Sequence, residues 1–276
     1  MKKNLSTIIL ILVFLTGLSL LLYPSVSDYW NSFHQSRAIA TYASDVAALD
    51  DQTYEKLWED AQAYNKRLLQ REEPLRQTEK RMEEYERLLN VDATGVMGYI
   101  EIPELKVSLP VYHGVDEGVL QIAVGHIPGS SLPVGGKGTH CVLSGHRGLP
   151  SAKLFTNLDE LREGDRFMLR VLDETLTYEV DQILIVEPQE VDDIAIDPEQ
   201  DYCTLVTCTP YGINTHRLLV RGHRVENQAD AQTIRVTADA MQIEPVIVAP
   251  IVAPMLLGLM LWVLLRNPKK KRKNTH

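Results

Sequence analysis

Two uncharged apolar runs near the ends of the sequence constrain the fold more than any other feature. The first covers residues 5–22 and the second covers residues 246–265. Each is about as long as a helix needs to be to cross the roughly 30 Å hydrocarbon core of a bilayer. We therefore predict two transmembrane helices. A cleaved signal peptide is the alternative for the first run, but the residues after it form a poor small-residue cleavage site.

The distribution of charge predicts how the chain is oriented in the membrane. Residues 1–4 and 266–276 hold eight of the 28 basic residues and no acidic residue. The middle of the chain keeps 20 basic against all 37 acidic residues, a net charge of −17. Because Lys- and Arg-rich flanks stay cytoplasmic, we predict a two-pass membrane protein with both tails inside and the middle outside the cell. The acidic middle has no basic surplus for phosphates, which argues against nucleic acid as a partner.

Residues 23–90 have the pattern of a helical segment. Apolar side chains recur at helical spacing, as in the stripe formed by Leu57, Ala61, Tyr64 and Leu68. The pattern stops at Glu73 and Pro74 because proline cannot continue a helix. It resumes over residues 79–89. We predict helices that pack against the main domain.

Over residues 91–226 the spacing of the apolar residues changes from that of helices to that of strands. The predicted strands cover residues 98–103, 107–112, 140–144, 166–172, 175–186, 202–207 and 216–224. A short helix is expected at residues 151–161, and a solvated acidic loop at 187–201. Short turns between strands indicate a sandwich or a closed barrel, and closure is favoured because it removes exposed strand edges. Residues 227–245 then form a linker to the second apolar run.

The chemistry of the chain centres on a thiol at the end of a strand. Cys208 follows the predicted strand at 202–207, and Arg217 lies on the strand after the Pro-Tyr-Gly turn. Alternation along the two strands places Cys208 and Arg217 on one outer face. Nearby positive charge favours the thiolate, which is the reactive form of cysteine. We predict that the other two cysteines, Cys141 and Cys203, are small buried apolar residues without a disulfide.

A nucleophilic thiol also needs a base, and the chain offers eight histidines. The contest is between His126 and His146, and both follow a glycine. His146, in the Ser-Gly-His-Arg-Gly stretch at residues 144–148, is the leading candidate. The remaining histidines lie in the helical segment, within or beside strands, or at the terminus.

These motifs resemble the sortase family, and specifically its pilin-polymerising class C. The Thr-Leu-x-Thr-Cys signature is met at residues 204–208, followed by the arginine after the turn. The histidine stretch at 144–148 and the segments 125–133 and 154–158 match in the same order. The resemblance implies a mainly β fold with a closed sortase-type barrel, here with short helices and an N-terminal helical segment. It also implies Cys208 as nucleophile, His146 as general acid and base, and Arg217 as stabiliser of the substrate and the oxyanion.

The resemblance further implies the reaction and its partners. The substrate would be an LPxTG-like sorting signal, cleaved through a thioester and transferred to a lysine amine of a pilin subunit outside a Gram-positive type of cell. Thr204 and Thr207 are assigned to substrate binding, and no cofactor or metal is expected. A housekeeping sortase that anchors proteins to peptidoglycan, a papain-like protease and a non-catalytic membrane-tethered scaffold are the alternatives.

A lid over the active site is a further expectation from the resemblance. Class C sortases usually carry an Asp-Pro-aromatic motif in the helical segment, where the Asp faces the arginine and the aromatic side chain covers the cysteine. The nearest match here is Glu73, Pro74 and Leu75, which lacks the aromatic residue. We predict that Glu73 pairs with Arg217 and that Leu75 covers the thiol.

Overall fold

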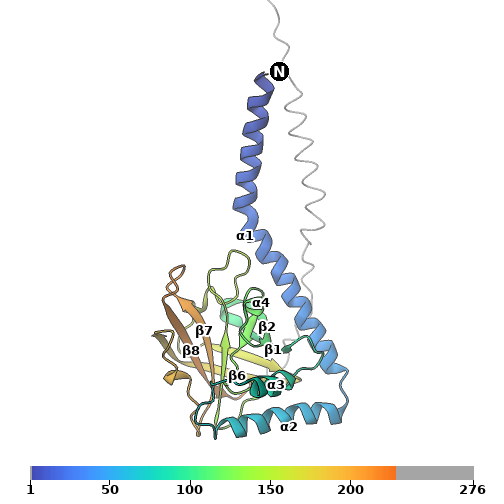
Figure 1. Cartoon of the computed structure of the whole chain (residues 1–276), viewed down its shortest axis with the longest axis vertical. Coiled ribbons are helices and arrows are strands. Elements are labelled where there is room, and N and C mark those ends of the chain that lie inside the picture. The colour runs from blue at the N-terminus through green and yellow to red at the C-terminus, as the bar shows by residue number, and fades with distance from the viewer. Residues whose placement is uncertain (1, 228–276) are drawn as a thin grey trace, which may run out of the picture. The chain divides into compact units, whose positions relative to one another are not determined.

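The structure is a computed structural model that describes residues 2–227. The second apolar run, the basic tail and the predicted linker from residue 228 onward lie outside the described residues. Helix α1 (Lys2–Ala47) joins the first apolar run to the helical segment without interruption. Within residues 2–227 it is the one helix long and apolar enough to cross a membrane. α1 bends along its length (Figure 1) and contains Pro24, whose ring cannot donate the helical hydrogen bond.

Two shorter helices follow α1, as predicted. Helix α2 (Asp51–Leu68) begins after Asp50, whose carboxylate accepts a hydrogen bond from the Thr53 amide at 2.8 Å. Helix α3 (Glu79–Arg87) begins after Thr78. The stripe predicted on α2 faces the protein, because Ala61, Tyr64 and Leu68 are buried. The connection between α2 and α3 contains Glu73 and Pro74, where the break was predicted.

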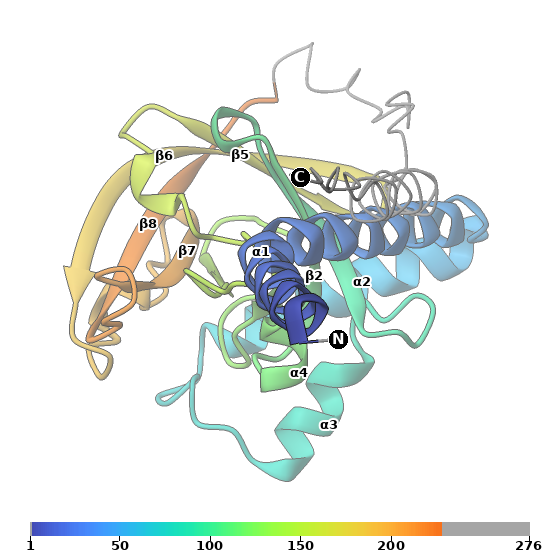
Figure 2. The ribbon, with the colours of Figure 1, turned by 90° about the horizontal axis from the view of Figure 1, so that it is seen from above.

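The strands of the described region close into a barrel, which confirms the predicted fold class. They are β1 (Val96–Ile102), β2 (Val107–His113), β3 (Val124–His126), β4 (Thr139–Ser144), β5 (Arg166–Val171), β6 (Glu174–Val186), β7 (Asp201–Thr209) and β8 (His216–Val225). Their order around the barrel is β1-β2-β3-β4-β7-β8-β6-β5, and β5 pairs back with β1. Figure 2 shows β6, β8 and β7 side by side on one side of the barrel. Strand β3 was not predicted, because three residues are too few to show alternation.

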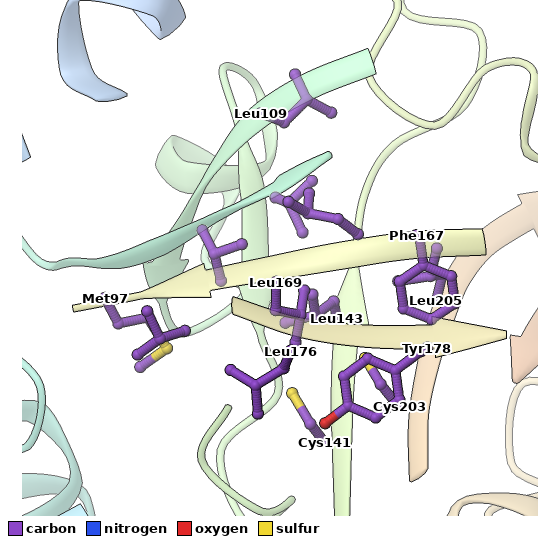
Figure 3. Close-up of a cluster of buried hydrophobic side chains, with 14 of the residues drawn as sticks. Met97, Leu109, Cys141, Leu143, Phe167, Leu169, Leu176, Tyr178, Cys203 and Leu205 are labelled. Carbon is purple, nitrogen blue, oxygen red and sulfur yellow. The ribbon is translucent and has the colours of Figure 1, made fainter. Parts of the chain in front are cut away.

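The interior of the barrel is filled by apolar side chains from several strands. Figure 3 shows Met97, Leu143, Phe167 and Leu205 among them. Cys141 and Cys203 are buried here as predicted, at directly paired positions of the parallel strands β4 and β7. The barrel therefore has a packed core rather than an internal ligand site.

The connections between the strands contain little helical structure. Helix α4 (Glu117–Leu120) and the 3-10 turns η1 (Pro103–Leu105), η2 (Leu158–Glu160) and η3 (Asp192–Ile194) are short. The helix predicted over residues 151–161 is wrong, since only η2 forms there. Leu154 adopts a positive φ of 39°, which a helix does not allow, and Phe155 is buried against Gly145. Tertiary packing of Phe155 overrides the local pattern.

Candidate active site

Strands β7 and β8 place a thiol and a guanidinium opposite each other. Cys208 is directly paired with Arg217, one residue before the ladder ends at Thr209 and His216. Both side chains are half-buried. Their neighbours Thr207 and Leu218 point into the barrel and are buried. The predicted parity of the two strands is thus confirmed, and Cys208 and Arg217 share the outer face.

The loop after β4 is bonded to the same end of β7. The Gly145 amide donates to the Val206 carbonyl at 3.0 Å, and the Thr207 hydroxyl donates to the Gly145 carbonyl at 2.7 Å. Gly145 and Thr207 are the residues immediately before His146 and Cys208. The loop therefore holds the backbone of His146 beside the end of β7 that carries the thiol.

Arg147, the residue after His146, also contacts the end of β7 and the turn that follows it. Its guanidinium donates to the Thr209 hydroxyl at 3.4 Å and forms an ion pair with Asp159 at 2.5 Å. It also lies over the ring of Tyr211, in the β7–β8 turn. The side chain of Arg147 is only 9% exposed, whereas that of Asp159 is 47% exposed, so water reaches the ion pair from the side of the carboxylate. The roles of Arg147 and Asp159 were not predicted, because no spacing rule links an arginine to a carboxylate twelve residues later.

The guanidinium of Arg217 is accessible to a substrate. It donates to the backbone carbonyls of Asn214 and His216, at 3.4 and 3.1 Å. Among the described residues no carboxylate lies within ion-pair distance of it. The neighbouring His216 approaches Glu187 at 3.3 Å. Arg217 thus keeps donors for a carbonyl or oxyanion bound at Cys208.

His126, the competing histidine, lies in a different environment. Its ring is fully buried and contacts the Tyr85 hydroxyl at 3.0 Å and the Ser131 carbonyl at 2.8 Å. It also stacks on Tyr85, from α3. Both ring nitrogens are therefore used to join α3 to the loop after β3, which supports a structural role for His126.

The comparisons with known proteins agree with this geometry. The family model of the sortase domain matches residues 100–225. The structure of sortase C1 from Streptococcus agalactiae is similar with a TM-score of 0.67 and 50% sequence identity, covering 70% of this chain and all of that one. The chain belongs to the sortase family. Sortases are cysteine transpeptidases, and the predicted resemblance to class C is confirmed by such structural relatives.

Other relatives of this sortase share less of its sequence. The structure of Streptococcus pneumoniae sortase C has 43% identity and a TM-score of 0.62, covering 70% of this chain and 98% of that one. Clostridium perfringens sortase C, solved with the C-terminal cell wall sorting motif, has 41% identity and a TM-score of 0.61, covering 70% and 100%. Among curated sequences, Bacillus subtilis sortase D is 32% identical over 46% of this chain. The match spans 63% of that relative's length, which is less than two thirds of it.

The two remaining cysteines of this sortase are separated from the site. Cys141 is 2% exposed and Cys203 is fully buried, whereas Cys208 is half-buried. Burial raises the pKa of the Cys203 thiol well above its ordinary range, which keeps that thiol protonated. Cys208 is therefore the cysteine placed to react. No group of three His, Cys, Asp or Glu side chains within residues 2–227 is arranged to hold a metal ion.

An apolar patch lies on the outer face of the barrel beside the Cys208–Arg217 pair. It consists of Val142, Val186, Val206 and Leu219, with Ile127, Leu184 and Ile194 packed on it. Val206 pairs with Leu219 two positions along the ladder from Cys208. Ile194 belongs to the β6–β7 connection, where the Ala195 carbonyl accepts a hydrogen bond from the His140 ring at 2.8 Å. The β6–β7 connection therefore covers this apolar cluster on the face of the sheet that carries the thiol.

The two threonines assigned to substrate binding are engaged inside the protein. Thr207 is 1% exposed and its hydroxyl is used by Gly145. Thr204 is equally buried, and its hydroxyl lies 2.7 Å from Nε2 of His140. Their side chains thus position the His146 loop and the β6–β7 connection. Only the backbone of Thr207 stays a candidate for contact with a substrate.

The lid candidate packs on the loop after β3. A Cβ added to Gly129 would lie 2.4 Å from the Pro74 carbonyl and 2.7 Å from Cα of Leu75. Glu73 forms its ion pair with Arg76 at 3.1 Å, and the expected pair with Arg217 is not formed. Glu73 pairs with Arg76 rather than Arg217 because Arg76 is only three residues away in the sequence. Leu75 is half-buried at this place.

Proposed function

We propose that this chain is a membrane-anchored cysteine transpeptidase of class C, which joins pilin subunits through LPxTG-like sorting signals. The observation that carries the proposal is the cross-strand pair of Cys208 and Arg217 beside the His146 loop. The structural relatives at 41–50% identity support the class, and one of them was solved with a sorting motif.

In the proposed reaction the Cys208 thiolate attacks the carbonyl carbon between Thr and Gly of the signal. Arg217 donates hydrogen bonds to the oxyanion that develops. His146 gives a proton to the departing glycine amine, the C–N bond breaks and a thioester remains. A lysine amine of another pilin then attacks the thioester while His146 takes its proton. The C–S bond breaks, an isopeptide bond forms and the thiolate is restored.

The position in the membrane is part of the proposal. The apolar first half of α1 supports an anchor at the N-terminal end of the chain. The predicted orientation puts the barrel outside the cell, where pilins are exposed. The second span at residues 246–265 stays a prediction from sequence.

One experiment tests the chemistry. The full-length chain in detergent is incubated with a sorting-signal peptide alone, with a pilin domain that carries an acceptor lysine, or with a peptidoglycan stem peptide. We expect a mass increase on Cys208 equal to the acyl fragment, which the pilin lysine removes. The Cys208→Ala variant is the control. Absence of any adduct favours a non-catalytic scaffold, whereas transfer only to a peptidoglycan stem amine favours a housekeeping sortase.

A further inference from the structure

One face of α1 carries a stripe of large apolar side chains beyond the first apolar run. Tyr23, Val26, Trp30 and Phe33 are between 46% and 62% exposed. Their spacing of three, four and three residues places them on one side of the helix. We call these four residues the aromatic stripe. Exposed apolar side chains gathered in this way indicate a surface that meets a partner.

The barrel occupies the opposite side of α1. The contacts there are Asp28 with the Lys153 amide at 2.8 Å, Asn31 with the Ser151 carbonyl at 2.8 Å, Gln35 with the Ile122 carbonyl at 2.7 Å, and Tyr42 with the Met97 carbonyl at 3.1 Å. With 3.6 residues per turn, these positions lie about half a turn away from the aromatic stripe. The barrel therefore leaves most of the stripe uncovered. Trp30, at the edge of the stripe, lines a cavity with Pro110 and Ile122 but stays 52% exposed.

The charges around the stripe suit an anionic lipid surface. Between residues 4 and 44 the chain has one carboxylate, Asp28, and it faces the barrel. The stripe is followed on its own side of the helix by Arg37, which is exposed. Tyr and Trp prefer the boundary between headgroups and acyl chains, and arginine extends its cation to the phosphates.

The dimensions require α1 to incline where the stripe begins. From Tyr23 to Phe33 the helix rises about 15 Å at 1.5 Å per residue. Each headgroup layer is only about 5–8 Å thick. A helix perpendicular to the membrane would carry Phe33 beyond the lipid, whereas an inclined one keeps the whole stripe within the layer. Helix α1 contains Pro24. It bends along its length (Figure 1), and this bend supplies such an inclination.

We infer that the aromatic stripe lies in the headgroup layer of the outer leaflet, so that α1 is held between the lipid surface and the barrel. The inference rests on the membrane anchoring in the proposed function. Asn31 contacts residue 151 and Asp28 contacts residue 153. The amide of Phe155 donates a hydrogen bond to the carbonyl of His146. The same helix therefore fixes the segment behind His146 close to the membrane. A second copy of the chain on the stripe is the competing occupant, and it lacks the continuity with the membrane span.

The test uses tryptophan as a depth probe in the full-length chain. Trp58→Phe and Trp262→Phe leave Trp30 as the single tryptophan, and Cys208→Ala removes any dependence on catalysis. The chain is placed in nanodiscs of phosphatidylcholine and phosphatidylglycerol with a spin label at the headgroup or deep in the acyl chain. We expect a larger loss of Trp30 emission with the headgroup label. Phe33→Glu should reduce that loss, while Ser36→Glu on the flank of α1 should not.

A second probe separates this inference from the anchoring on which it rests. Phe14→Trp, with Trp30→Phe added, reports on the apolar run and should lose most emission to the deep label. If the probe at position 14 is quenched but Trp30 is not, the stripe is outside the lipid and the inference is overturned alone. If neither is quenched, the anchor and the inference both fail. If Trp30 responds to the number of chains per disc but not to the label, a second copy covers the stripe and the inference is also overturned.

Discussion

The hydroxyl of Thr207 donates a hydrogen bond to the carbonyl of Gly145 at 2.7 Å, and these residues directly precede Cys208 and His146, the proposed nucleophile and the proposed acid and base. The bond lies inside the barrel wall, where Thr207 is 1% exposed. It therefore links the strand of Cys208 to the loop of His146 without touching the substrate. The geometry of the pair depends on this internal contact.

We predict that Thr207→Val lowers both stability and turnover. Leaving the buried Gly145 carbonyl without a donor costs about 1–3 kcal/mol. The loosened His146 loop should reduce kcat more than it raises KM, since a displacement of about 1 Å can cost on the order of a hundredfold in rate. Thr207→Ser keeps the donor and should retain most activity. Equal activity of Val and Ser variants would show that the bond does not position the loop.

The sequence was sufficient to predict most of this fold. Alternation predicted seven of the strands and the parity of Cys208 and Arg217, because both faces of β7 and β8 have distinct chemistry. It did not predict β3, which is too short, or the non-helical path around Leu154, which depends on burial of Phe155. The internal roles of Thr204 and Thr207 were also missed. Their hydrogen bonds join residues more than sixty positions apart, so no local pattern reports them.

Arg147 should act as a positioning residue for His146. It bridges Asp159 and Thr209, on either side of the reacting groups. We predict that Arg147→Gln lowers kcat at least tenfold with a small change in KM, because binding of the signal does not use this side chain. Arg147→Lys keeps the charge but not the paired donors, so its kcat should be intermediate. Asp159→Asn should resemble Arg147→Lys. A change confined to the melting temperature would indicate a purely structural role.

Alkylation should distinguish the three thiols. We predict that iodoacetamide near neutral pH modifies Cys208 and leaves Cys141 and Cys203 intact, since the latter two are at most 2% exposed. Tandem mass spectrometry of tryptic peptides measures the modification and assigns it to one cysteine, since Cys203 and Cys208 share the peptide of residues 171–217. In urea all three should react, and the native Cys208→Ala variant should gain no label. Comparable labelling of all three in the native chain would contradict the site.

Stability should rise with pH around the ordinary pKa of histidine. Burial lowers the pKa of His140 from its usual 6.5, assisted by Arg221 and opposed by the Ala195 carbonyl and Asp181. Between the lowered pKa and 6.5 the unfolded chain binds more protons, so stability is lost as the pH falls through this window. We predict a lower melting temperature at pH values about one unit below the ordinary histidine pKa than at values about one unit above it. His140→Gln should reduce the difference, and an unchanged difference in that variant would show that burial of His140 is not its cause.

The lid can be tested through the glycine on which it packs. At Gly129 an added Cβ would collide with Pro74 and Leu75, so Gly129→Ala should push residues 73–77 off the barrel. If these residues restrict access to the site, Cys208 should then be alkylated several-fold faster than in the parent chain. The rate of modification with excess iodoacetamide measures this.

Gly164 provides the matched control for that substitution. Its φ of +94° is close to the +93° of Gly129, but no heavy atom lies within 4 Å of its added Cβ. Gly164→Ala therefore carries the same backbone strain without displacing a neighbour. We expect it to leave the alkylation rate of Cys208 unchanged. If both alanine variants alter the rate equally, strain rather than displacement is responsible, and residues 73–77 do not cover the thiol.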